Sequence, residues 1–164
     1  MNDAPETSLL FDVFALSQAV GRLLAGAMRD GPLTPTEYAI YSAVFELEAA
    51  TPTTLAARLG MRLTTFMDQL RLLESRGHAR RVPHPTDGRS YKVVLTAAGL
   101  EAHLAANRRF EDAHRALWSH LPEWERERER GAQGSLRAIR EAAEAAMRDV
   151  GEAATPRPRV GRAG

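Results

Sequence analysis

The chain has 164 residues, enough to bury one good core, and it is most simply a single domain. It has no cysteine, which excludes a disulfide framework and a thiolate zinc site. The net charge of +1 hides an uneven distribution, because residues 58–92 carry eight Arg or Lys and three Asp or Glu. A basic middle on an otherwise acidic body predicts docking on phosphate groups, with chance clustering in an Arg-rich chain as the alternative.

Residues 8–29 predict a helix with a seam for pairing. Its apolar residues follow a 4-3-4-3-4 spacing, which is typical of coiled coils. The seam consists of Leu9, Val13, Leu16, Val20, Leu23 and Ala27. No signal-peptide pattern and no apolar run of about 18 residues is recognised in the chain. We therefore expect a cytoplasmic protein that does not span a membrane.

A second helix is predicted to begin at residues 34–37, where Thr-Pro-Thr-Glu forms a capping box with proline at the first helical position. It carries the apolar residues Tyr38, Tyr41, Val44, Phe45 and Leu47.

Residues 51–78 predict a helix-turn-helix. Thr51 and Pro52 form a helix start, and Gly60 ends that helix. A second helix follows and ends at Gly77. Its 3-4-3 spacing predicts one inward stripe, made of Leu63, Phe66, Leu70 and Leu73. Such a pair of helices places its second helix in the major groove of DNA, although pairs of this size also occur in proteins that bind no DNA.

Two short strands, residues 79–83 and 91–95, are predicted to form a hairpin with a basic tip. Arg89 at the tip would enter a narrow minor groove. Asp87 would hold the Arg89 guanidinium in a bidentate pair. The alternative for this segment is an ordinary surface hairpin with a local ion pair.

The remaining chain predicts two more helices and a tail. Thr96 would cap a long helix with an apolar stripe made of Leu100, Leu104, Phe110, Leu117 and Leu121. The last helix would use Leu136, Ile139, Ala143, Met147 and Val150, with Gly131 and Gly134 weakening or breaking it. The alternating Glu-Arg run at 125–130 is expected to be a solvated face, and the tail from residue 151 is expected to be disordered.

Four motifs carry a resemblance to a known family. They are L-A-x-x-L-G at 55–60, L-E-S-R-G at 73–77, D-G-R at 87–89 and L-T-x-x-G at 95–99. In order and spacing they resemble the MarR (multiple-antibiotic-resistance regulator) family of bacterial winged-helix repressors. The chain departs from the family at Arg62, where Ser or Thr is frequent, and at Asp68, where a basic residue is frequent.

The predicted fold is mainly α with a small two-stranded β-wing: a winged helix-turn-helix with N- and C-terminal dimerisation helices. One domain is expected over residues 1–150, with the winged helix-turn-helix at about 34–95, dimerisation helices at about 8–29 and 97–150, and a tail at 151–164. The resemblance implies a homodimeric transcriptional repressor in the bacterial cytoplasm, nucleoid-associated when it is bound to palindromic double-stranded DNA. The predicted DNA-contacting residues are Thr53, Thr54, Arg62, Thr64, Thr65, Asp68, Arg71, Asp87 and Arg89.

The resemblance also implies release by a small, aromatic ligand held between the dimerisation helices and the DNA-reading lobe. The aromatic residues available for such a pocket are Phe14, Tyr38, Tyr41, Phe45 and Phe110, each of which is otherwise a core residue. A winged-helix interaction or architectural module without ligand sensing is the alternative. Enzyme motifs are absent, no cofactor or metal is expected, and His103, His114 and His120 lack ligand spacing.

Overall fold

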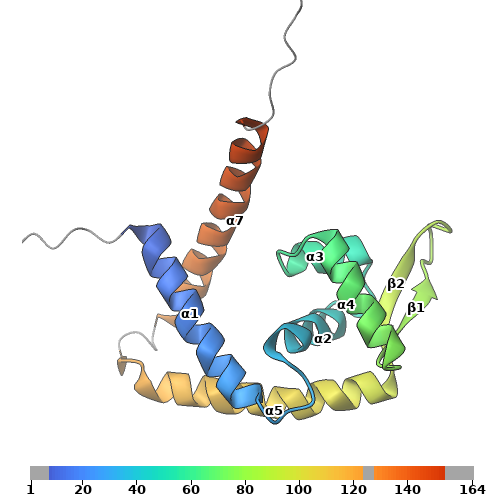
Figure 1. Ribbon diagram of the computed structural model, residues 1–164, viewed down its shortest axis with the longest axis horizontal. Coiled ribbons are helices and arrows are strands. Elements are labelled where there is room, and N and C mark those ends of the chain that lie inside the picture. Colours follow the sequence, from blue (N-terminus) through green and yellow to red (C-terminus); the bar gives the residue numbers. More distant parts are fainter. Residues whose placement is uncertain (1–7, 124–127, 154–164) are drawn as a thin grey trace, which may run out of the picture. The chain divides into compact units, whose positions relative to one another are not determined.

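The computed structural model describes residues 8–123 and 128–153, and of residues 129, 130 and 148–153 it describes the backbone alone. Helices dominate these residues, and one antiparallel hairpin follows the fourth helix (Figure 1). The elements are α1 (Leu9–Met28), α2 (Pro35–Glu46), α3 (Pro52–Arg58), α4 (Leu63–Ser75), β1 (Ala79–Pro83), β2 (Tyr91–Leu95), α5 (Ala97–His120) and α7 (Glu129–Ala153). The chain divides into two compact units, Met1–Leu117 and Trp118–Gly164.

The predicted helix starts and stops are confirmed in the first unit. Thr34 and Glu37 form the capping box of α2, and Thr51 caps α3. Gly60 and Gly77 have φ values of 63° and 70°, the left-handed conformation that ends a helix at little steric cost. The winged helix-turn-helix and both strands therefore begin and end where the sequence predicts.

One apolar core joins α2, α3, α4 and the hairpin. Its fully buried side chains come from all four elements and include Ile40, Tyr41, Leu55, Phe66, Leu70, Leu73 and Val93. The Tyr41 hydroxyl lies 2.8 Å from His78 Nδ1, so the polar end of this buried ring is satisfied. Side chains from elements distant in sequence fill one interior, which fixes the position of α4 relative to the hairpin.

A partly buried ion pair ties the end of α4 to the start of α2. Arg76 Nη1 lies 2.6 Å from Glu37 Oε1, and the other Glu37 oxygen accepts hydrogen bonds from the backbone and side chain of Thr34. Burial alone would raise the pKa of Glu37, but the hydrogen bonds from Thr34 and Arg76 outweigh it and lower that pKa. Glu37 is therefore ionised at neutral pH and holds both helices.

The start of α5 makes a close backbone contact with the hairpin. Thr96 donates to the Gly77 carbonyl at 2.6 Å, and its hydroxyl accepts from the Gly99 amide at 3.1 Å. A Cβ on Gly99 would lie 2.0 Å from the His78 carbonyl oxygen, so this position accommodates only glycine without a backbone shift. The L-T-x-x-G motif thus has a packing reason: it brings α5 against the entry of β1.

Two predicted apolar stripes are partly wrong. Leu63 is 45% exposed, so the inward stripe of α4 consists of Phe66, Leu70 and Leu73. On α5, Leu104 and Leu117 are exposed, and the buried residues are instead Gly99, His103, Ala106 and Ala113. A spacing of three or four residues marks a helix face, but it does not show which face meets the rest of the fold.

Helix α1 exposes most of its apolar side chains in the single chain. The predicted seam residues Leu9 and Leu16 are exposed, as are Phe11 and Phe14. By length and composition alone, α1 is also apolar enough to cross a membrane, which corrects the expectation that the chain holds no such run. Its Asp12 and Arg22 interrupt the run, and a seam that buries one face against another helix accounts for the same composition.

Helix α7 is continuous through Gly131 and Gly134, so the predicted break is wrong. A 25-residue helix tolerates two glycines when its other residues are strong helix formers, and α7 is rich in Ala, Glu and Arg. It exposes Leu136 and Met147. The helix runs to Ala153, three residues beyond the expected end. Residues 124–127 of the Glu-Arg run and the tail residues 154–164 lie outside the described residues.

Candidate nucleic-acid interface

Three segments predicted to contact DNA meet at one surface cavity of about 270 Å³. They are the start of α3, the first turns of α4 and the outgoing side of the hairpin tip. The residues that line this cavity are Thr51, Pro52, Thr53, Leu63, Met67, Arg89, Ser90 and Tyr91. The structure therefore places the first helix of the motif, the second helix and the wing on a common face.

The outward arc of α4 is as predicted. Thr64, Thr65, Asp68 and Arg71 are all exposed, on the side opposite Phe66 and the rest of the buried stripe. Arg71 Nη1 lies 2.5 Å from Asp68 Oδ1, so the carboxylate orients the guanidinium along the helix surface. Both side chains are about two-thirds exposed, and their ion pair adds little stability. Its consequence is geometric, because it restricts the directions in which Arg71 can point.

Helices α3 and α4 begin with different N-caps. Thr51 Oγ1 caps α3 by accepting the Thr54 amide at 3.3 Å, and it also lies 2.9 Å from the Thr54 hydroxyl. Thr53 is exposed and faces the shared cavity. Arg62 occupies the N-cap of α4 without a side-chain hydrogen bond to the helix, and it is exposed. The departure from Ser or Thr at this position therefore leaves the amides at the start of α4 without a side-chain cap.

The wing tip is held together by its own backbone and by Asp87. Asp87 Oδ1 accepts the Arg89 amide at 3.0 Å, and the Asp87 carbonyl accepts the Ser90 amide at 3.0 Å. His84 Nδ1 accepts the Asp87 amide at 3.2 Å from across the turn. No ion pair joins Asp87 to the Arg89 guanidinium in the part of the chain that the structure describes, so the predicted bidentate pair is wrong. Asp87 instead forms the turn that presents Arg89 to solvent.

A second network joins the wing to α4, and sequence reasoning missed it. Arg81 on β1 donates from Nε and Nη2 to the two oxygens of Glu74, at 2.7 and 3.0 Å. The same guanidinium stacks on the Tyr91 ring of β2 at 4.6 Å. The Tyr91 hydroxyl in turn lies 3.7 Å from Met67 Sδ on α4. These contacts fix the wing relative to α4.

A separate cavity of about 300 Å³ opens beside the aromatic residues of α2 and α5. Tyr38 stacks on Phe110 at 4.9 Å, and its hydroxyl donates to Asn107 at 2.7 Å. The other lining residues include Leu24, Ala39, Ser42, Glu46, Arg58 and Leu59. Of the five aromatic residues predicted for a pocket, Tyr38 and Phe110 line this one. Phe45 lines a different cavity, Tyr41 is in the core, and Phe14 is exposed on α1.

His103 is a core residue. It is 4% exposed and packs between Tyr38 at 5.5 Å and Phe45 at 5.0 Å. Burial lowers the pKa of His103, while the Glu46 carboxylate acts in the opposite direction. The neutral ring therefore serves as an aromatic spacer between α2 and α5. Among the described residues, no group of three or more His, Cys, Asp or Glu is placed to hold a metal ion.

Comparisons with known proteins place this fold among transcriptional regulators. No protein-family model matches the chain. The HTH-type transcriptional regulator TtmR of Methylorubrum extorquens (strain PA1) is 29% identical over 94 residues, which span 57% of this chain and 48% of that protein. A crystal structure of a probable transcriptional regulator from Pseudomonas aeruginosa is 26% identical and covers 81% of this chain and 99% of that one, with a TM-score of 0.68.

Two further solved structures share the fold at lower identity. Wild-type MarR from E. coli in its apo form is 21% identical over 79% of this chain and 97% of its own, with a TM-score of 0.68. The transcriptional repressor CouR, bound to a 23-mer DNA duplex, is 22% identical over 80% of this chain and 92% of its own, with a TM-score of 0.70.

The fold is thus the winged helix of the MarR regulators, and the resemblance carried by the four motifs is confirmed at that level. The proteins to which the chain is similar are DNA-binding transcriptional regulators rather than enzymes.

Proposed function

We propose that the protein is a homodimeric, sequence-specific DNA-binding regulator of the MarR type that represses transcription in the cytoplasm. One observation carries the proposal: the start of α3, the start of α4 and the wing tip line a single surface cavity. Internal packing of the helix pair does not require an exposed Arg89 at the wing tip or an exposed polar face on α4. Contact with DNA accounts for both features. The transcriptional repressor CouR, which shares the fold, is bound to a DNA duplex, and this supports the same use of the fold here.

In this proposal α4 lies in the major groove. Arg71, oriented by Asp68, would bond guanine O6 and N7, and Thr64 and Thr65 would contact thymine methyl groups or phosphates. The exposed Leu63 at the edge of the shared cavity would add an apolar contact to a thymine methyl group or a sugar. Asp68 would accept from cytosine N4 when it is not engaged with Arg71.

The flanking segments would position the protein on the duplex. Thr53, Thr54 and Arg62, close to the starts of α3 and α4, would contact phosphates, and Arg89 would enter the minor groove. Two copies related by a two-fold axis would read a palindrome with half-sites one helical turn apart.

Selection from a random duplex library tests the proposal. Repeated binding and amplification should enrich an inverted repeat whose half-sites lie about 10 base pairs apart. A parallel selection with the Arg71→Ala variant should lose preference at one position of each half-site while it keeps the spacing, because the phosphate and wing contacts remain. Recovery of unenriched sequence with the unmodified protein would contradict sequence-specific binding.

We further propose that a small aromatic ligand occupies the cavity beside Tyr38 and Phe110. The walls of this cavity come from four elements: Leu24 belongs to α1, and the other lining residues belong to α2, α3 and α5 or follow them directly. A ligand there would therefore touch both a proposed dimerisation helix and the DNA-reading lobe. The dimer would exist in two states, one with its recognition helices spaced for DNA and one with them misplaced. A ligand that binds the misplaced state more tightly weakens DNA binding by at most the ratio of its affinities for these two states.

A pocket-filling variant tests this ligand proposal. Ala39 lines the cavity and is itself exposed, so Ala39→Trp should fill the cavity without replacing a core side chain. In a panel of benzoate and phenol derivatives, at least one compound should release the unmodified protein from its operator, and the same compound should leave Ala39→Trp bound. Equal release of both proteins would place the ligand elsewhere, and a panel without any effect would contradict an aromatic effector.

A further inference from the structure

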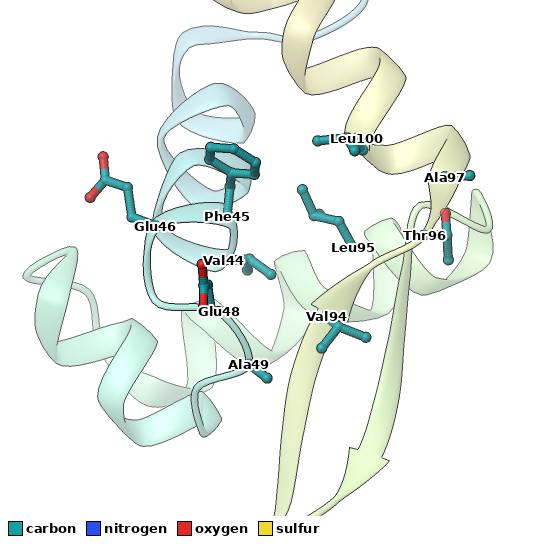
Figure 2. Close-up of a pocket in the computed structure, with 10 residues that line it drawn as sticks. All are labelled: Val44, Phe45, Glu46, Glu48, Ala49, Val94, Leu95, Thr96, Ala97 and Leu100. Atoms are coloured by element: carbon teal, nitrogen blue, oxygen red, sulfur yellow. The ribbon is translucent and has the colours of Figure 1, made fainter.

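A larger cavity, of about 630 Å³, lies on the fold between the end of α2, strand β2 and the start of α5. Figure 2 shows Phe45, Leu95 and Leu100 converging from these three elements across its interior. Phe45 is half exposed although it is a large aromatic residue, because one side of its ring packs on His103 and the other side borders the cavity. The volume is in the range that accommodates a small organic ligand.

The charge of this cavity has one sign. Two carboxylates, Glu46 and Glu48, line it, and among the residues that the structure describes no Arg, Lys or His does so. Glu46 points away from the interior in Figure 2 and is paired with Arg58 at 3.2 Å. Glu48 is exposed, and within the described part of the chain no ion pair or hydrogen bond of its carboxylate is found. An apolar interior with an aromatic edge and an uncompensated carboxylate complements an organic cation.

We propose that this cavity binds an organic ammonium ion with an apolar body. The apolar body would lie against Leu95 and Leu100, and the cation would lie between the Phe45 ring and the Glu48 carboxylate. A ring face attracts a cation through its quadrupole, and the carboxylate adds a direct charge interaction. A neutral or anionic ligand gains neither, so the site discriminates by charge.

This site is separate from the cavity beside Phe110, since of the described residues that line the two cavities only Glu46 is common to both. Its wall includes Val94 and Leu95 of β2, one strand of the wing. Any effect of the ligand on DNA binding would therefore pass through the wing and rests on the proposed function. Binding of the cation itself needs no DNA, so the two proposals can fail independently.

A titration of the isotopically labelled full chain followed by NMR tests the site, with benzyltrimethylammonium as the probe. Methyl signals of Val44, Val94, Leu95 and Leu100 should shift in a saturable manner, while Leu24 and Leu59 in the other cavity should not. Benzyl alcohol and phenylacetate, a neutral and an anionic aromatic compound of similar size, should bind more weakly. Shifts that map to Leu24 and Leu59, or phenylacetate binding as tightly as the cation, would overturn the proposal.

A charge-neutral variant supplies the second readout. Glu48→Gln keeps the size of an exposed side chain, so the fold should persist, and the dissociation constant for the cation should rise about two- to fivefold, as expected for loss of one exposed ion pair. Glu101→Gln, an exposed carboxylate on α5 that does not line the cavity, is the matched control and should leave the constant unchanged. Equal dissociation constants for Glu48→Gln and the unmodified protein would show that the Glu48 carboxylate does not take part in binding the cation.

Discussion

Arg89→Ala is expected to abolish most specific DNA binding while leaving the fold and the dimer intact. Arg89 is exposed at the wing tip, so its removal deletes no core contact. In the proposed complex each protomer would lose a cation inserted in a narrow minor groove. One such base-level contact is worth about 1–3 kcal/mol, and a dimer loses two, so operator affinity should fall by about 30-fold or more.

Fluorescence anisotropy on the selected operator would measure this loss. Arg108→Ala, which removes an exposed arginine of α5 away from the proposed interface, controls for the change in net charge. Operator affinity of Arg89→Ala equal to that of Arg108→Ala would show that the wing tip is an ordinary hairpin.

Substitutions at Asp87 separate two roles of its carboxylate: accepting the Arg89 amide in the turn, and attracting the Arg89 guanidinium by its charge. Because Asp87 Oδ1 accepts the Arg89 amide, Asp87→Asn keeps an acceptor oxygen and should retain most of the affinity, whereas Asp87→Ala should lose more. If both variants lost the same affinity, the charge of Asp87, and not its turn, would be what orders Arg89 on DNA.

Leu16→Glu combined with Ile139→Glu is expected to convert the protein into monomers. Leu16 is an exposed residue of the predicted 4-3-4-3-4 seam of α1, and Ile139 belongs to the predicted apolar stripe of α7. Burial of one such side chain contributes about 1.5–3 kcal/mol, and a two-fold interface buries each residue twice. An unpaired carboxylate in its place would be desolvated at the interface, so the dimer should dissociate at micromolar concentration.

Sedimentation velocity checks the assembly. Gln18→Glu introduces the same side chain on an exposed, off-seam position of α1, and it should leave the dimer unchanged. An unmodified protein that sediments as a monomer would contradict the proposed assembly, and a double variant that remains dimeric would place the interface on other residues.

The local signals in the sequence predicted most element boundaries of the winged helix-turn-helix closely. Capping residues, terminating glycines and turn formers act on the few residues beside them. The start of α2, both ends of α3 and both strands could therefore be placed without tertiary information. Three residues of the motif at 73–77 now have a physical role. Glu74 pairs with Arg81, Arg76 pairs with Glu37, and Gly77 takes the left-handed conformation.

The features that were missed depend on the fold. Glu74 and Arg81 are seven residues apart, and only the turn at Gly77 and the direction of β1 bring their side chains together. On α5 the leucine spacing suggested the wrong face, because the buried residues are Gly99, His103, Ala106 and Ala113. Close approach to the His78 carbonyl at the entry of the hairpin requires glycine at position 99, and no helix periodicity signals that contact. Likewise, Asp87 and Arg89 could be recognised as a pair, but the backbone conformation decided that the amide, and not the guanidinium, is the partner.

The face shared by α3, α4 and the wing is proposed to read a DNA sequence. The most direct test is the ratio of affinities for the selected palindrome and for a duplex of equal length and scrambled sequence, measured at one fixed salt concentration. Specific recognition predicts a ratio of about a thousand or more, together with a steep decline of both affinities as salt is raised. Equal affinity for the two duplexes would contradict the account, because it would leave only the attraction of a basic surface for phosphate.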